Sequence, residues 1–251
     1  MASTLRRYSV SRSGHQCVIN TPCGAVGVCQ IFGIGLNYAA HAREQGSPLP
    51  ERPVVFAKNV GSAVPGGEAI VIPAICQDRE QVDFEGELAI VIGTPARDVP
   101  TERALEFVLG YAAANDVSAR WWQKQGSGGQ FCRGKGFDTF CPLGDVTPAA
   151  QVANPNALRL VTRVNGTVMQ DSSTSDMIFS CATLVSELSR GCTLLPGTVI
   201  LTGTPSGVGM ARNPQVFLQH GDVVEVEIEG VGVVRNPVVR EGAAENGKMA
   251  K

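Results

Sequence analysis

Residues 88–92 are apolar at every position, and the acidic residues Asp83, Glu85 and Glu87 alternate with apolar or small residues just before them. Alternation with a period of two predicts a β-strand, and the short run that is apolar on both faces predicts that this strand continues inside a sheet. Residues two apart share one face of a strand. Glu85 and Glu87 are therefore expected to project together from the start of a buried strand.

This acidic row has two explanations. Like charges on one face repel each other and are costly beside an apolar segment, and a divalent cation held by their oxygens removes that cost. The same alternation recurs at Glu225, Glu227 and Glu229, where it is typical of a half-buried strand with one solvated face. The pattern alone leaves both explanations open at 83–87, although the buried continuation gives a physical reason to consider metal.

The remaining pattern predicts a β-rich α+β chain with a few short helices. Strands are expected near 31–35, 54–57, 69–72, 86–92, 158–170, 198–202 and 222–234. Helices are expected over 38–45, with Asn37 as N-cap and Gly46 after the end, over 101–114, around 118–124 before a glycine-rich loop, and over 181–190. The helix over 101–114 follows from a spacing near 3.6 in its apolar residues. Residues 1–30 are expected to be a short N-terminal β extension, 31–240 one catalytic domain, and 241–251 a disordered tail.

Composition narrows the function. The chain has 251 residues, 43% of them hydrophobic and 18% charged, with a net charge of -2, which argues against general nucleic-acid affinity. The longest apolar runs are far shorter than a membrane span, so no membrane association is expected. None of the eight cysteines forms a Cys-x-x-Cys pair, which favours thiols of a cytoplasmic protein over disulfides. The start of the chain is rich in Arg and Ser, as in an organellar transit peptide, so a mitochondrial location is the alternative. A short basic strand is the preferred interpretation of this segment.

Two glycine-rich segments resemble catalytic motifs without matching them. The stretch from Gly129 to Gly136 is close to a phosphate-binding loop, but Gly136 stands where the hydroxyl residue belongs and no helix is expected to follow. Ser206 lacks the flanking glycines of a nucleophile elbow. The glycines between 203 and 209 could still let backbone amides approach a carboxylate.

Of the three histidines, His41 has an acidic residue in phase. Glu44 lies three residues on, so the two side chains share one face of the short helix over 38–45. A carboxylate that orients an imidazole is the arrangement of a general base, and a solvent-exposed pair is the alternative. His15 and His220 are expected to have no catalytic role.

These motifs, read together, resemble the fumarylacetoacetate hydrolase family over residues 31 to 238. The matching stretches are GLNYAAHARE (35–44), PVVFAK (53–58), DFEGEL (83–88), NDVSARWWQ (115–123), GKGFDTFCPL (134–143), VNGT (164–167), SDMI (175–178) and LPGTVILTGTP (195–205). The resemblance implies a mixed β-sandwich or roll and favours the metal explanation of the acidic row. Two positions depart from the family's usual pattern: Ala40 stands where similar sequences often have Asp, and Gly136 where they have serine.

The resemblance also implies a set of site residues. Glu85, Glu87 and Asp116 would hold one Mg2+ or Mn2+ ion, a cation that suits oxygen ligands. The implied catalytic residues are His41, Glu44, Gln123 and Lys135, and the implied substrate-binding residues are Arg120, Gly203 and Thr204. Asp83 is assigned no contact with the ion.

The activity implied by the resemblance is hydrolysis of a carbon–carbon bond in a 1,3-diketo acid such as an acylpyruvate or fumarylpyruvate. The metal would polarise the pyruvate portion, His41 with Glu44 would activate water, and Lys135 with Gln123 would stabilise the oxyanion. The alternatives on the same site are decarboxylation of oxaloacetate and isomerisation or hydration of a 2-oxo (di)acid. The implied partners are a small α-keto acid substrate and a second copy of the chain in a homodimer, and the helix of His41 with the loop 47–53 is a candidate lid.

Overall fold

The structure is a computed structural model that describes residues 6–243. Its centre is strand β9 (Gly86–Ile92), in which every residue is buried. β9 pairs with β10 (Val108–Asn115) on one side and with β16 (Thr198–Leu201) on the other, both antiparallel. The spatial order of this eight-stranded sheet is β5 (Val54–Lys58), β4 (Gln30–Gly35), β16, β9, β10, β12 (Cys141–Leu143) and β6 (Ala63–Pro65), with β13 (Thr147–Pro148) paired to β10.

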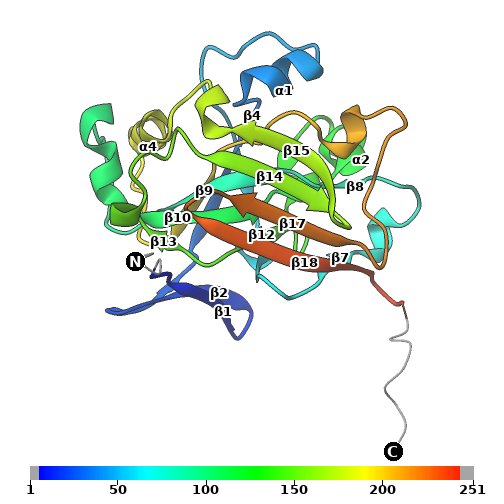
Figure 1. The fold of residues 1–251 in the computed structure, drawn as a ribbon, viewed down its shortest axis with the longest axis horizontal. Coiled ribbons are helices and arrows are strands. Elements are labelled where there is room, and N and C mark those ends of the chain that lie inside the picture. The colour runs from blue at the N-terminus through cyan, green and yellow to red at the C-terminus, as the bar shows by residue number, and fades with distance from the viewer. Residues whose placement is uncertain (1–5, 244–251) are drawn as a thin grey trace, which may run out of the picture.

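A second sheet and a helix cover one face of this sheet (Figure 1). Its order is β15 (Thr167–Ser173), β14 (Arg159–Val164), β17 (Val223–Ile228), β18 (Gly232–Arg240) and β7 (Ile70–Ile72), and the helix is α4 (Cys181–Ser189). Leu88 and Ile90 of β9 pack here in one core cluster with Leu160 and Val226. Burial of each such side chain contributes about 1.5–3 kcal/mol relative to exposure, so this face is a main source of stability.

The opposite face of β9 is also covered. A three-stranded sheet formed by β1 (Ser9–Ser13), β2 (Gln16–Thr21) and β3 (Gly24–Gly27) contributes Cys17 and Ile19 to a second cluster, which includes Ala89 and Val91 of β9. Alternate residues of β9 thus enter different cores, which is why the sequence is apolar at every position there. The strand-rich α+β architecture with few helices confirms the expected fold class.

Short helices and strand pairs complete the chain. The helices are α1 (Ala39–Glu44), α2 (Arg120–Gln123) and α3 (Phe131–Lys135), and β8 (Val82–Asp83) pairs with β11 (Ser118–Ala119). The 3-10 helices are η1 (Val60–Ser62), η2 (Ala74–Cys76), η3 (Thr101–Phe107), η4 (Gln125–Ser127), η5 (Ala149–Gln151), η6 (Thr174–Asp176) and η7 (Gly209–Ala211).

The helix predicted over 101–114 is wrong. Only residues 101–107 are helical, as the 3-10 helix η3, and the rest is the central strand β10. The alanines at 112–114 have high helix propensity, but all three are buried between the two cores, where pairing with β9 satisfies the backbone. Tertiary context therefore overrides local propensity here.

Two smaller predictions also need correction. Asn37 is not an N-cap, because Tyr38 occupies that position without a side-chain cap, and the Asn37 amide instead binds Thr202 O at 2.7 Å and the backbone of Phe179. The segment after Gln123, expected to be a glycine-rich loop, contains η4 and α3.

Other expectations are confirmed. Strands occupy the ranges given for them, α4 matches the helix over 181–190, and three short strands lie within residues 9–27. Glu227 of β17 is exposed and pairs with Arg163, so the acidic row at 225–229 is a solvated face. All eight cysteines, each within the described residues, are free thiols. Of the tail predicted over 241–251, residues 244–251 lie outside the described residues.

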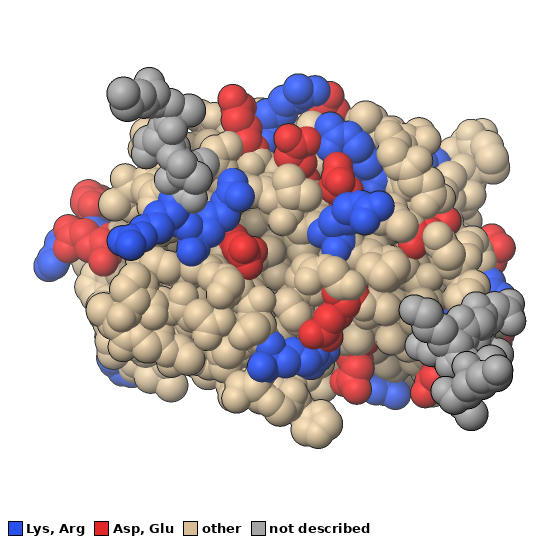
Figure 2. Space-filling view, turned by 60° about the horizontal axis from the view of Figure 1, so that its bottom comes forward, with Lys and Arg blue, Asp and Glu red and all other residues tan. Residues whose placement is uncertain are grey.

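Two surface observations bear on partners. Among residues 6–243, no helix has the length and apolarity needed to cross a membrane. On the face shown in Figure 2, basic and acidic side chains are interspersed rather than gathered into a field of one sign. This distribution is consistent with the net charge of -2 and gives that face no electrostatic footprint for nucleic acid.

Candidate active site

Three buried carboxylates come together where β9 begins and β10 ends. The antiparallel register places Ala114 opposite Glu87, so Asp116, two residues further on, lies beside Glu85, whose carbonyl accepts the Asp116 amide at 2.8 Å. One carboxylate oxygen from each of Glu85, Glu87 and Asp116 lies within 4.8 Å of the others. The fold thus brings together the three residues expected from the sequence, Asp116 from the end of a strand rather than of a helix.

Gly86 allows β9 to pack closely against β14 between the two acidic residues. A Cβ at position 86 would lie 1.9 Å from Oγ1 of Thr162 on β14, so only glycine fits between the sheets at this point. The Gly86 amide donates to Gln170 at 2.9 Å, and its carbonyl accepts the Thr204 hydroxyl at 2.9 Å. Side-chain groups thereby satisfy the backbone between the two acidic residues.

Two buried lysines neutralise part of the acidic cluster. Lys135, at the end of α3, donates to Glu85 at 2.9 Å and to Asp116 at 2.6 Å, and Lys58, at the end of β5, donates to the other oxygen of Asp116 at 2.5 Å. Burial acts to raise the pKa of Glu85, but the charges of Lys135 and Arg120 outweigh it and lower that pKa. Burial likewise acts to lower the pKa of Lys135, and the charges of Asp116 and Glu85 raise it overall.

Glu87 is the carboxyl group of the triad that forms no ion pair with a lysine or arginine among residues 6–243. Within the described residues its hydrogen-bond partner is the amide of Gly203, at 2.7 Å, in a backbone conformation with φ of +95° that favours glycine. Burial, followed by the charges of Asp116 and Glu85, raises the pKa of Glu87 well above its ordinary value. Three crowded carboxylates with unbalanced charge fit a divalent cation with oxygen ligands, which would offset this repulsion.

Arg120 at the start of α2 is anchored by two acidic residues. Its guanidinium donates to Asp83 at 2.7 and 2.9 Å and to Glu85 at 2.5 Å. The same nitrogen that binds Glu85 also donates to Gln123 at 3.0 Å. Asp83 therefore serves as the partner of Arg120, and it is not part of the group of three carboxylates that could share one ion.

His41 and Glu44 form a pair on α1. Nδ1 of His41 lies 2.9 Å from Oε2 of Glu44, whose other oxygen accepts the Gly207 amide at 2.8 Å. Burial acts to raise the pKa of Glu44, but the His41 hydrogen bond and the Gly207 amide lower it overall. The ionised carboxylate fixes the imidazole, whose other nitrogen has no hydrogen-bond partner among residues 6–243 and is available to a ligand.

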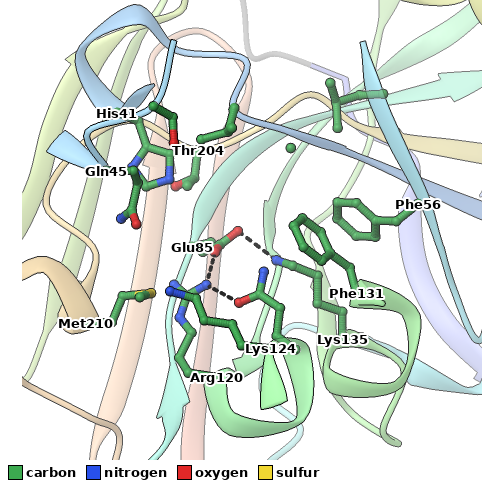
Figure 3. Close-up of a pocket in the computed structure, with 15 residues that line it drawn as sticks. His41, Gln45, Phe56, Glu85, Arg120, Lys124, Phe131, Lys135, Thr204 and Met210 are labelled. Atoms are coloured by element: carbon green, nitrogen blue, oxygen red, sulfur yellow. Dashed lines mark hydrogen bonds and ion pairs between the residues drawn. The ribbon is translucent and has the colours of Figure 1, made fainter. Parts of the chain in front are cut away.

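A cavity of about 270 Å3 joins these groups (Figure 3). Six of the predicted site residues line it: His41, Glu85, Arg120, Gln123, Lys135 and Thr204. Glu87 and Asp116 are not among the lining residues. The imidazole of His41, hydrogen-bond donors and one carboxylate of the triad therefore face one space, from five separate segments of the chain.

The loop after β16 holds several of these groups through its backbone. Besides the amides of Gly203 and Gly207, those of Gly209 and Met210 donate to the two oxygens of Asp83, at 2.8 and 2.9 Å. The sequence indicated that these glycines could let amides approach a ligand carboxylate. In the structure the amides bind carboxylates of the protein itself.

Sequence reasoning missed Lys58 as a member of this cluster. Its side chain is fully buried beside Asp116. A signal was present, because Lys58 shares a strand face with Phe56, two residues before it, and a lysine in the buried phase of a strand requires an anionic partner.

The chain is similar to a group of known proteins. Residues 30–239 match the family model described as "Fumarylacetoacetate (FAA) hydrolase C-terminal". An oxaloacetate tautomerase from Xenopus laevis, named mitochondrial, is 45% identical over 84% of the chain, and the chain spans 65% of that protein's length.

Two solved structures are also similar. A 5-carboxymethyl-2-hydroxymuconate delta-isomerase from Mycobacterium smegmatis is 41% identical, with a TM-score of 0.76 and 94% of each chain covered. A fumarylpyruvate hydrolase from Pseudomonas aeruginosa, in complex with Mn2+ and pyruvate, is 32% identical, with a TM-score of 0.79 and coverage of 96% and 99%.

Proposed function

Because the chain belongs to the fumarylacetoacetate hydrolase family, we propose that it is a divalent-metal-dependent enzyme that moves a proton at the carbon next to the keto group of a 2-oxo acid. The preferred reaction is tautomerisation or isomerisation of a 2-oxo dicarboxylic acid of the oxaloacetate type. The observation that carries the proposal is that the His41–Glu44 pair and the carboxylate of Glu85 face the same cavity.

The residues divide the chemistry between them. Mg2+ or Mn2+ held by Glu85, Glu87 and Asp116 would withdraw electron density from the keto group and so acidify the adjacent C–H. The free nitrogen of His41 then takes the proton from carbon 3, or returns it there. Glu44 keeps the ring oriented and stabilises it while it carries the proton. The net change moves one proton between carbon 3 and the keto oxygen and needs no co-substrate.

Lys135 and Gln123 line the same cavity; the Gln123 amide provides a hydrogen-bond donor at the reacting carbonyl, and Lys135 provides a positive charge beside it. Lys135 is held by Glu85, Asp116 and the Ser118 hydroxyl, so its position is fixed before substrate binds. A positive charge that is held in place in this way stabilises developing negative charge on oxygen without reorganisation. Thr204, whose hydroxyl is bonded to Gly86 O and Gln170, contributes to the wall of the substrate site.

The second candidate is the acylpyruvate hydrolase reaction expected from the sequence, in which His41 activates water. It is supported by the similarity to the fumarylpyruvate hydrolase, which extends over 96% of this chain. The order of the candidates follows the higher identity of the tautomerase and isomerase relatives, at 45% and 41%. Oxaloacetate decarboxylation on the same site is the remaining alternative.

One experiment compares the three reactions. The Mn2+-loaded protein is incubated with oxaloacetate and, separately, with an acylpyruvate, and the keto–enol ratio, pyruvate release and loss of diketone are followed. We expect faster keto–enol exchange without pyruvate formation. Cleavage of the acylpyruvate alone would favour the hydrolase, pyruvate from oxaloacetate the decarboxylase, and no change with any 2-oxo acid would overturn the proposal. A His41→Ala variant is the control for the reaction centre.

A further inference from the structure

The buried charges around the cavity would leave a net positive charge once a divalent ion is bound. Four carboxylates are buried at the site, and they are Asp83, Glu85, Glu87 and Asp116. Three buried cations accompany them, and they are Lys58, Arg120 and Lys135. With the two charges that a divalent ion would add, this set has one positive charge in excess, enough for the carboxylate beside the keto group of a substrate.

Lys124 is a third cation in the cavity wall, besides Arg120 and Lys135. It lines the cavity, and within residues 6–243 its ammonium has neither an ion-pair nor a hydrogen-bond partner. Glu85 is the one carboxylate among the lining residues, and it is already bonded to Arg120 and Lys135. The protein therefore provides Lys124 with no anion, although the side chain stands next to another cation.

The local backbone explains why Lys124 faces the cavity. It is the C-cap of α2, and its amide donates to the carbonyls of Arg120 and Trp121, which closes the last turn of the helix. Residues three and four apart share one helix face, which places Lys124 on the side of Arg120. Figure 3 shows the two side chains next to each other, and burial together with the Arg120 charge lowers the pKa of Lys124.

We propose that Lys124 is a specificity-determining residue that binds the second, distal carboxylate of a 2-oxo dicarboxylic acid. This rests on the proposed function, because it assumes that the 2-oxo end lies at the acidic triad. Gln45 and Ser47, which follow α1, line the same cavity and add neutral polar groups to its wall. A substrate with a neutral distal end would leave the Lys124 charge uncompensated beside Arg120.

The test uses two ligands of equal length, 2-oxoglutarate and 2-oxopentanoate. The distal end of the first is a carboxylate, and that of the second is a methyl group. Their dissociation constants are measured by calorimetry on the Mn2+-loaded protein. We expect Lys124→Met to weaken 2-oxoglutarate binding about tenfold, which corresponds to about 1.4 kcal/mol, and to leave 2-oxopentanoate unchanged. Lys124→Arg keeps most of the preference, and Lys124→Glu reverses it.

Arg43→Met is the matched control, because Arg43 is an exposed cation on α1 that does not line the cavity. An equal loss of 2-oxoglutarate affinity in this control, or an unchanged ratio in Lys124→Met, would overturn the role of Lys124. Failure of the unchanged protein to bind either ligand would instead overturn the proposed function. Binding of both ligands with equal affinity would overturn the inference alone. Because Lys124 is exposed, these variants are expected to fold, and the Mn2+ affinity of each verifies it.

Discussion

The ammonium of Lys58 lies 2.5 Å from Oδ1 of Asp116, and both side chains are withdrawn from solvent. Lys135 holds the other oxygen of the same carboxylate at 2.6 Å. Asp116 is thus clamped between two lysines from distant segments of the chain. Its orientation toward Glu85 and Glu87 is set before any metal or substrate arrives.

Replacing Lys58 with Met tests this clamp. Removal of one partner from a buried ion pair leaves charge uncompensated and costs about 3–5 kcal/mol. The remaining bond from Lys135 to Asp116 places the expected loss at the lower end, about 3 kcal/mol, measured by urea denaturation of the metal-free protein. Lys124→Met, at an exposed lysine, should change the free energy of unfolding by less than about 0.5 kcal/mol. Equal effects of the two substitutions would contradict the clamp.

Replacing Glu87 with Gln separates metal binding from folding. The pKa of Glu87 is raised by burial and by its two acidic neighbours, so the neutral amide should not lower the melting temperature of the metal-free protein. The rise in melting temperature that Mn2+ produces should be lost, because one of three ligands is gone. The matched control is Glu227→Gln on the solvated face of β17, which should keep the Mn2+ effect. A full Mn2+ effect in Glu87→Gln would remove Glu87 from the proposed ligands.

Replacing His41 with Ala should abolish catalysis but not ion binding. The imidazole is bonded to Glu44 and not to the triad, and loss of a general base lowers kcat by about 10²- to 10⁴-fold. Affinity for Mn2+ and for oxalate should stay within about twofold, measured by calorimetry. Unaltered turnover in this variant would refute the role of the pair as the base.

The pH dependence of stability reports on Glu44. Its folded-state pKa is lower than the ordinary value of 4.5, so the carboxylate stabilises the folded state above that pH. This contribution is lost as the pH falls below 4.5 through the lowered pKa. Melting temperatures of the unchanged protein and of Glu44→Gln should therefore differ at pH 6 and converge in acid. A difference that widens on acidification would contradict the lowered pKa. The effect is small, because the side chain is partly open to solvent.

The sequence predicted the parts of the fold that a period or a turn residue marks. Residues 88–92 could be identified as a buried strand because both of their faces are apolar, and the end of α4 because Gly191 follows it. Strand β10 was misjudged because its alanines suit a helix in isolation. In the structure these small side chains fit the narrow space between the two core clusters, and a single-sequence pattern does not reveal that space.

The site was predictable to the extent that side-chain chemistry is visible in a motif. Glu85, Glu87 and Asp116 could be grouped through a family resemblance, and the structure brings them within reach of one ion. Lys58 and Lys124 were not singled out, because their importance depends on which charges remain unpaired after folding. That balance is a property of the assembled cluster and not of any one segment.

The loop after β16 has a consequence for variation in the chain. The amides of Gly203, Gly207, Gly209 and Met210 hold Glu87, Glu44 and Asp83. Every amino acid except proline provides an amide, so these hydrogen bonds by themselves do not require a particular side chain. Glycine is nevertheless favoured at 203 and 207, whose φ values are +95° and +102°, and at 209, where a Cβ would lie 1.8 Å from the carbonyl oxygen of Val216. Position 210 is compatible with many different side chains, and Met210 also lines the cavity. A substitution at this position can therefore change the shape of the cavity while the backbone hydrogen bonds that orient the acidic groups are kept.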